Sequence, residues 1–238
     1  MRGLSGPVLV SAHFQGVITS ALAGQGDADS RTCVNGYSFT PLGKKTFAVT
    51  IAAFPIFTCF RFGISMSSFQ VRPATLRDAK AIAQIHTASA TEAYRGLVPD
   101  DQLKSMSSVE KRQAYWREAI EYCEPQVQVA IDGDKIVGFV GFDRSRDEKS
   151  RPTTGEIWAI YAAPSHWGQG VGVTLWDAAR DGLAEEGCTN VTAWVPLRNE
   201  RALRFHEMAG FKREMSTAKT AVIGGIKIEE VRLKRPLN

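Results

Sequence analysis

The chain of 238 residues lacks any long uninterrupted apolar segment. Its most apolar stretch, residues 47–60, is broken by Pro55 and is shorter than the roughly 20 residues that a transmembrane helix needs. About 46 residues precede this stretch, which does not fit the short leader of a secreted protein. We therefore expect no membrane association and a cytoplasmic location.

Cysteine and histidine are also scarce, with four of each in the chain. The cysteines form no C-x-x-C pair, and neither residue type is clustered at the spacing of metal ligands. We expect no metal site and no disulfide framework, and we interpret the cysteines as free thiols of a reducing compartment. The residues concerned are Cys33, Cys59, Cys123, Cys188, His13, His86, His166 and His206.

A strong excess of one charge is missing as well. The formal net charge is +4, with 44% hydrophobic and 23% charged residues, which is ordinary for a globular protein and too little to indicate a nucleic-acid partner. Residues 1–65 are poor in acids, whereas Met66 begins a stretch typical of a domain start. We expect an N-terminal extension over 1–65, either disordered or upstream of the true start, with an organellar transit peptide as an alternative. One domain then occupies 66–238.

The most informative motif is the run from Trp158 to Gly172, WAIYAAPSHWGQGVG. It predicts a buried strand, a sharp turn, and glycines at alternate positions that open a helix near Val173. Glycines allow positive φ and close approach of the backbone to a ligand, and a helix N-terminus offers unpaired N–H groups to phosphate. The spacing matches neither the dinucleotide fingerprint nor a P-loop. It predicts a pyrophosphate-bearing ligand held by the main chain.

A second motif lies at a fixed distance from the first: residues 199–211, NERALRFHEMAGF. Together the two runs resemble the GNAT superfamily, the acyl-CoA-dependent N-acyltransferases. The first is similar to that family's R/Q-x-x-G-x-G/A loop and the second to its N-x-x-A-x-x-F-Y-x-x-x-G-F helix. The resemblance covers roughly Phe69 to Leu233. Trp167 stands where the family usually has Arg or Gln, and His206 stands where it usually has Tyr.

The resemblance implies an α/β (α+β) fold with a mixed, mostly antiparallel central sheet flanked by helices. It also implies that the sheet splays between its fourth and fifth strands, and that acyl-CoA threads the gap. The patterns themselves predict helices over 75–90, 108–122, 173–186 and 201–209. They predict strands over 69–73, 127–131, 136–142, 156–162 and 191–195, followed by a closing pair from 211 onward and over 226–233.

Acetyl-CoA is the co-substrate that the resemblance implies. Backbone groups of one strand would bind its pantetheine arm, and the glycine loop would hold its pyrophosphate. Asn199 is either a side-chain contact to the cofactor or only the N-cap of the helix that follows it. The implied cofactor-binding residues are Ile160, Tyr161, Ala162, Trp167, Gly168, Gln169, Gly170, Val171, Gly172 and Asn199.

The implied chemistry requires a neutral amine, and deprotonating an amine of pKa about 10.4 near pH 7.4 costs about 4 kcal/mol. Glu156, on the strand that leads to the glycine loop, is the candidate base; the alternative is a paired residue at the strand end. His206 is the candidate acid for the departing thiolate, or else it only packs at the edge of the core. Neither run contains a cysteine, so we expect direct attack in a ternary complex.

The acceptor side is less specified by the sequence. Tyr94, Leu97 and Trp116 are candidates to line it, although aromatic side chains at such spacing are more often core. We expect an N-acetyltransferase acting on a primary amine of a small molecule or peptide. A protein N-terminus or lysine as acceptor is one alternative, and a non-catalytic acyl-CoA-binding module is another. The closing strands also permit a homodimer.

Overall fold

The computed structural model describes residues 69–96, 98–99, 103, 108–223 and 226–237. The extension expected over 1–65 and the acceptor-side candidate Leu97 therefore lie outside the described residues. The division at residue 66 stays a prediction.

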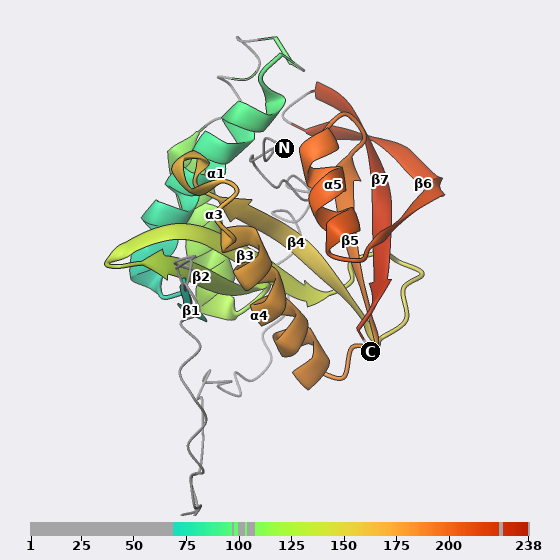
Figure 1. Ribbon diagram of the computed structural model, residues 1–238, viewed down its shortest axis with the longest axis horizontal. Helices are drawn as coiled ribbons and strands as arrows, with labels where there is room; N and C mark the ends of the chain where they lie inside the picture. Colours follow the sequence, from blue (N-terminus) through green and yellow to red (C-terminus); the bar gives the residue numbers. More distant parts are fainter. Residues whose placement is uncertain (1–68, 97, 100–102, 104–107, 224–225, 238) are drawn as a thin grey trace, which may run out of the picture. The chain divides into compact units, whose positions relative to one another are not determined.

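Seven strands form one sheet in the order β1-β2-β3-β4-β5-β7-β6 (Figure 1). Every neighbouring pair is antiparallel except β4 and β5, which run parallel. The predicted fold class is confirmed. The strands are β1 (Gln70–Pro73), β2 (Gln126–Asp132), β3 (Lys135–Arg144), β4 (Thr154–Ala162), β5 (Asn190–Pro196), β6 (Lys212–Ile223) and β7 (Ile226–Pro236).

Helices cover both faces of the sheet (Figure 1). A Cβ atom at Gly141 of β3 would meet the Trp116 ring, whereas one at Gly138 would meet the side chains of Val171 and Leu175. The helix that carries Trp116 and the helix that carries Leu175 therefore lie on opposite faces. The helices are α1 (Ala79–Tyr94), α3 (Val109–Tyr122), α4 (Val171–Glu185) and α5 (Glu200–Met208), with short 3-10 turns η1 (Leu76–Asp78) and η2 (Pro164–His166).

Two helix boundaries differ from the prediction. α1 continues to Tyr94, four residues past the expected end, because Ala90 and Tyr94 are both buried at a spacing of one turn and packing carries the helix onward. α4 begins at Val171 rather than Val173, because Gly170 adopts the left-handed conformation at φ 97° and serves as the N-cap. Gly172 therefore belongs to the first turn of α4 and not to the loop.

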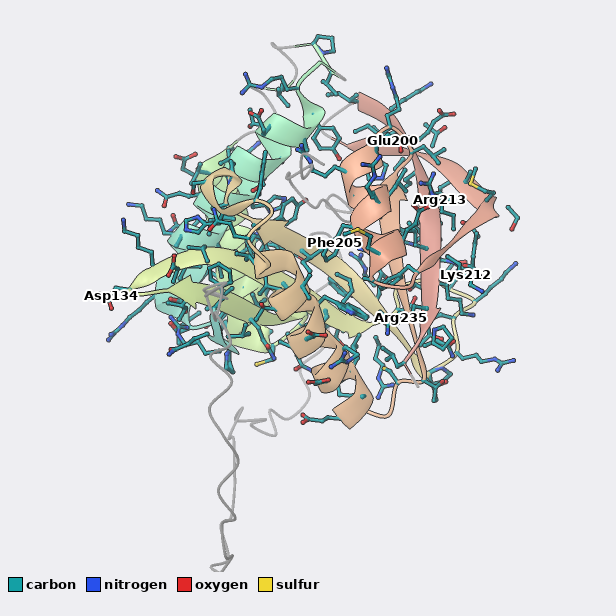
Figure 2. The ribbon with its side chains drawn as sticks, in the orientation of Figure 1. Asp134, Glu200, Phe205, Lys212, Arg213 and Arg235 are labelled. Atoms are coloured by element: carbon teal, nitrogen blue, oxygen red, sulfur yellow. The ribbon has the colours of Figure 1, made fainter. Side chains whose placement is uncertain are left out.

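The hairpin of β2 and β3 closes as its sequence indicates. Gly133 supplies a positive φ of 57° in the two-residue turn, and Figure 2 shows Asp134 at the tip of this hairpin.

At the other end of the sheet, Arg235 of β7 donates to the Ala209 carbonyl and lies 5.2 Å from the centre of the Trp176 ring. This arginine, labelled in Figure 2, fixes the end of α5 against the closing strands.

The parallel pair β4–β5 is short. Its register runs from Thr154 opposite Asn190 to Ile157 opposite Ala193, and no further pairing of these two strands occurs within the described residues. On its other side β4 stays paired with β3 as far as Ala162, with a bulge that leaves Trp158 unpaired. The predicted splay between the fourth and fifth strands is confirmed.

In the described part of the chain, no helix is long and apolar enough to cross a bilayer. Cys188 is a buried free thiol, as expected. Cys123 is instead disulfide-bonded, so the interpretation as free thiols is wrong for that residue.

Gly138 of β3 has no room for a side chain. An added Cβ would lie 2.6 Å from Val171 Cγ1 and 2.9 Å from the Tyr161 carbonyl oxygen, and the backbone atom cannot move aside cheaply. We expect Gly138→Ala to lower the free energy of unfolding by about 1–3 kcal/mol, measured by urea denaturation. As a control, Val222→Ala at an exposed position of β6 is expected to change it by no more than about 0.5 kcal/mol. Equal stability of Gly138→Ala and the parent chain would contradict this packing.

Candidate active site

The divergence of β4 from β5 leaves one edge of β4 without a neighbouring strand, among the described residues, from Trp158 to Ala162. The Ala162 carbonyl at its end accepts hydrogen bonds from Ser89 Oγ and from Trp167 Nε1, both at 2.8 Å. The main-chain groups between these points can pair with an extended ligand in the way that a further strand would. They include Ile160, Tyr161 and Ala162, whose backbone the family resemblance implies as a ligand contact.

The glycine loop follows directly. Gly168 and Gly170 have φ angles of 74° and 97°, a conformation that favours glycine and turns the chain into α4. The half-buried Trp167 is held by its bond to Ala162, and the Arg201 guanidinium lies 5.2 Å from the centre of its ring. Gln169 donates from Nε2 to the Ser165 carbonyl at 2.9 Å, so its side chain closes the loop on itself.

The N-terminus of α4 ends this loop. Val171 is buried and starts the helix, so the first-turn N–H groups of α4, which have no partner within the helix, lie at the end of the loop. The positive end of the helix dipole adds to their attraction for an anion. The glycine loop and the helix start that the sequence predicts are thus present, with Gly172 inside the helix, and phosphate binding there stays a prediction.

Asn199 has two functions available to one side chain. Its Oδ1 accepts from the Ala202 backbone N–H at 3.1 Å and caps α5. The residue is only 6% exposed. Its Nδ2 is buried and has no hydrogen-bond partner within the described residues. A buried amide donor left unpaired is costly. The two interpretations of Asn199 are therefore compatible, because the oxygen caps the helix and the nitrogen is left to bind a ligand.

Glu156 lies within the sheet and is only 1% exposed. Arg146 engages both of its carboxylate oxygens: the guanidinium pairs with Oε1, and the backbone N–H donates to Oε2 at 3.0 Å. A Cβ at the neighbouring Gly155 would meet Leu183 of α4. Since neighbours along a strand face opposite ways, Glu156 points to the face of the sheet turned away from α4.

His206 is fully enclosed at 1% exposure. Its Nδ1 lies 2.8 Å from the Ala202 carbonyl, which can only accept, so Nδ1 carries the proton and Nε2 presents a lone pair. The Phe211 ring packs edge-on against it with centroids 5.1 Å apart. Burial lowers the pKa of His206 to about 4, so the ring is neutral at physiological pH.

The acceptor-side candidates Tyr94 and Trp116 are both buried. Trp116 is a core residue: it is 0% exposed and its indole N–H donates to His86 Nδ1 at 3.1 Å. Tyr94 lies close enough to Tyr161 and to Glu230 of β7 for their charges to raise the pKa of its hydroxyl, which burial raises most of all. Tyr94 therefore lies near β4 and β7, on the side where the strands diverge. Trp116 belongs to the core between α3 and the sheet.

Three charged residues of this region were not identified from the sequence. Arg146 belongs to a mixed-charge loop that is typical of solvated surface, yet it pairs with Glu156 and lies 3.9 Å from the centre of the Trp158 ring. Arg112 stands one helical turn before Trp116, a spacing that could have placed it on the same buried face. Glu230 is 0% exposed, and no local pattern in its strand distinguishes it from its neighbour Glu229.

Comparison with known proteins identifies the family of this chain. The model of a family described as the acetyltransferase (GNAT) family matches residues 85–211, more than half of the chain. The chain belongs to the GNAT family. The match includes both the glycine loop and the helix that Asn199 caps.

Curated relatives agree with the GNAT assignment. Over 167 residues the chain is 28% identical to the uncharacterized N-acetyltransferase YuaI of Bacillus subtilis, covering 70% of this chain and 92% of the relative. It is 30% identical over 129 residues to an uncharacterized N-acetyltransferase of Archaeoglobus fulgidus, covering 52% of this chain and 83% of that one.

Solved GNAT structures share the fold. A GCN5-related N-acetyltransferase from Rhodopseudomonas palustris superposes with a TM-score of 0.58 at 21% identity, covering 73% of this chain and 98% of that one. The acetyltransferase yncA from Salmonella typhimurium, solved with its cofactor acetyl-CoA, gives a TM-score of 0.54 at 22% identity and covers 72% and 95%.

The buried His206 makes the stability of this GNAT domain depend on pH. Its folded pKa of about 4 lies below the unfolded value of about 6.5, so the unfolded chain takes up the proton first as pH falls. Keeping the ring neutral lowers the free energy of unfolding only slightly above pH 6.5. At pH 4 it lowers this free energy by about 3 kcal/mol.

We expect His206→Phe, which keeps a ring between Phe205 and Phe211, to lose less stability than the parent chain as pH falls from 6.5 to 4. Denaturant unfolding across this range measures the difference. Some loss remains in both proteins because burial also lowers the pKa of His86. A stability difference that does not change with pH would contradict the prediction.

Proposed function

We propose that this GNAT protein is an N-acetyltransferase that transfers acetyl from acetyl-CoA to a primary amine by direct attack in a ternary complex. One observation carries the proposal: the buried Nδ2 of Asn199, unpartnered within the described residues, occurs together with the unpaired edge of β4 and the glycine loop. A backbone edge, a phosphate cradle and an amide donor are the groups that a nucleotide-linked pantetheine chain requires.

The residues fit acetyl-CoA in three places. The β4 edge around Ile160 and Tyr161 would pair with the amides of the pantetheine arm, and the loop with the start of α4 would hold the pyrophosphate. Asn199 Nδ2 would donate to the cofactor where it passes α5. When bound, acetyl-CoA supplies an activated acetyl thioester. The Salmonella acetyltransferase was solved with acetyl-CoA and the Thermoplasma acidophilum PaiA N-acetyltransferase with coenzyme A, which supports this choice.

The acceptor would approach from the opposite face. The glycine loop leads into α4 on one face, whereas Glu156, by the alternation along β4, points to the face that α1 and α3 cover. Acetyl donor and amine would then meet at the divergence from two sides, as direct transfer requires.

Glu156 is our proposed acceptor for the proton of the amine, through a water molecule. Both oxygens are already engaged by Arg146, so direct contact with the amine is less favoured than a relay. The same pairing also suits a purely structural carboxylate that pins the 145–153 loop to β4. The variants described below separate these two functions.

For His206 the hydrogen bond to Ala202 supports a role other than that of an acid. With the proton on Nδ1 and a pKa of about 4, Nε2 has no proton to give to a departing thiolate near neutral pH. We therefore revise its proposed role from acid to positioning residue: it orders α5 next to the cofactor. A thiolate, whose conjugate acid has a pKa of about 8.5, leaves without an acid.

The fold does not decide the acceptor. Among the similar solved structures are a ribosomal-protein-alanine N-acetyltransferase from Brucella melitensis and a protein described as a phosphinothricin N-acetyltransferase. We propose a small-molecule amine for the present chain, since Tyr94 closes the acceptor side as a buried side chain. A protein acceptor and a non-catalytic acyl-CoA-binding module remain the alternatives for the experiment.

The first experiment combines calorimetric titration of acetyl-CoA with a screen of amines by CoA release. We expect micromolar binding, and turnover that Glu156→Gln lowers about 100-fold in kcat while acetyl-CoA affinity stays within twofold. Arg146→Met is the matched control, because it breaks the same pair and keeps the carboxylate. Equal losses of rate and stability in both variants would make Glu156 structural. Binding with no turnover of any amine would favour the non-catalytic module.

Asn199 allows the cap and the cofactor contact to be tested separately. Asn199→Ser keeps a capping oxygen and removes Nδ2, so stability should change by only a few tenths of a kcal/mol, while acetyl-CoA affinity falls roughly 3- to 10-fold. Asn199→Ala removes both groups and should also cost about 1 kcal/mol of stability. Thermal unfolding and calorimetry measure the two effects. Unchanged affinity in Asn199→Ser would remove Nδ2 from the cofactor site.

A further inference from the structure

Arg112 of α3 lies on the face of the sheet that is proposed for the acceptor. Among the described residues, this cation has no anionic partner. Arg112 lies in the first half of α3, and its Nη1 is buried with no hydrogen-bond partner there. Burial lowers the pKa of the guanidinium, and the ionisable groups that act on it among the described residues are Tyr161 and Tyr94 and no carboxylate. A cation withdrawn from water without an anionic partner is unfavourable in the isolated protein.

Contacts one turn further along fix the helix that carries this guanidinium. One turn further along α3, Trp116 is fixed by its bond to His86 Nδ1 at 3.1 Å, and the His86 ring packs on Tyr161 with centroids 4.4 Å apart. Tyr161 belongs to the stretch of β4 whose other edge is unpaired within the described chain. Arg112 therefore belongs to the wall next to the divergence of the strands, on the acceptor face.

The surrounding hydroxyls do not neutralise the cation. Burial raises the pKa of both Tyr94 and Tyr161, so both stay as neutral phenols. A phenol satisfies one N–H of a guanidinium, whereas a carboxylate accepts two parallel N–H bonds and also supplies the missing charge. The site is thus complementary to a carboxylate that the described residues do not provide.

A negative charge also acts on Tyr94. Glu230 is 0% exposed and pairs with Lys219 at 3.7 Å, and it acts on the Tyr94 hydroxyl in the opposite sense to Arg112. The strand register places Glu230 opposite Pro196 on the same face as Glu156. An acceptor near Tyr94 would thus be within the influence of both a cation and an anion, which is compatible with the two charges of an amino acid.

We propose that the acceptor is a primary amine that also bears a carboxylate, such as an α-amino acid, and that the Arg112 guanidinium binds this carboxylate. The inference rests on the proposed N-acetyltransferase function and specifies its substrate class. Arg112 acts as a specificity residue: it holds the acceptor so that its amino group faces the thioester, while Glu230 favours the ammonium form on entry.

The test compares matched acceptors in the full chain. Each standard α-amino acid is assayed beside the amine that remains when its carboxylate is removed, at saturating acetyl-CoA. We expect the best carboxylate-bearing acceptor to exceed its matched amine at least 10-fold in kcat/KM, mainly through KM. In Arg112→Met this ratio should fall toward one, and Arg112→Lys should restore part of it. Arg117→Met, at an exposed position of the same helix, should keep the ratio of the parent chain.

The outcomes separate the two proposals. Turnover of amines without preference for the carboxylate, or a ratio that Arg112→Met leaves unchanged, overturns the present inference and leaves the N-acetyltransferase standing. Turnover of no amine by the parent chain, despite binding of acetyl-CoA, overturns both. If Arg112→Met fails to fold by thermal unfolding, the ratio measured for the parent chain and for Arg112→Lys decides, since a lysine keeps the charge but loses the paired N–H groups.

Discussion

The divergence of β4 and β5 after Ile157 and Ala193 is the constraint on which the whole site depends. A sheet normally satisfies its main-chain groups by continuous pairing. In the described part of the chain, one edge of the central strand β4 is left open while its other edge stays paired with β3. The glycine loop and the start of α4 follow directly after this open edge, and the cap of α5 follows β5, the strand that diverges from it. The proposed acyl-CoA ligand would complete this hydrogen bonding by pairing with the open edge.

Buried charges gather on the face of the sheet turned away from α4. Glu156 pairs with Arg146, and Asp147 from the same loop accepts from Trp194 Nε1 at 3.1 Å and pairs with Arg232 at 2.9 Å. One short loop thereby links three strands across the region where β4 and β5 separate. Because both partners are fixed in each pair, the loop holds the acceptor face in a defined shape although its sequence is that of a solvated segment.

Much of the fold was predictable because its signals are local. Alternation, turn glycines and capping residues located the elements, and two runs of fixed spacing located the glycine loop and Asn199. What escaped prediction depends on distant partners. No local pattern distinguishes a glutamate that pairs with Arg146, as Glu156 does, from a solvated one. That Arg112 has no counter-charge among the described residues can be seen only when α1, α3 and β4 are packed together. The helix start at Val171 depended on the conformation of Gly170.

The two departures from the family pattern have one physical feature in common. Trp167 donates its indole N–H to the Ala162 carbonyl, and His206 donates its Nδ1 proton to the Ala202 carbonyl, each at 2.8 Å. Both rings thus use their one available proton on main-chain oxygens, one at the end of β4 and one within α5. An indole has no other donor, and a neutral imidazole has only a lone pair left. In the proposed reaction, these two positions would therefore contribute less by donating a proton than by holding the backbone in place.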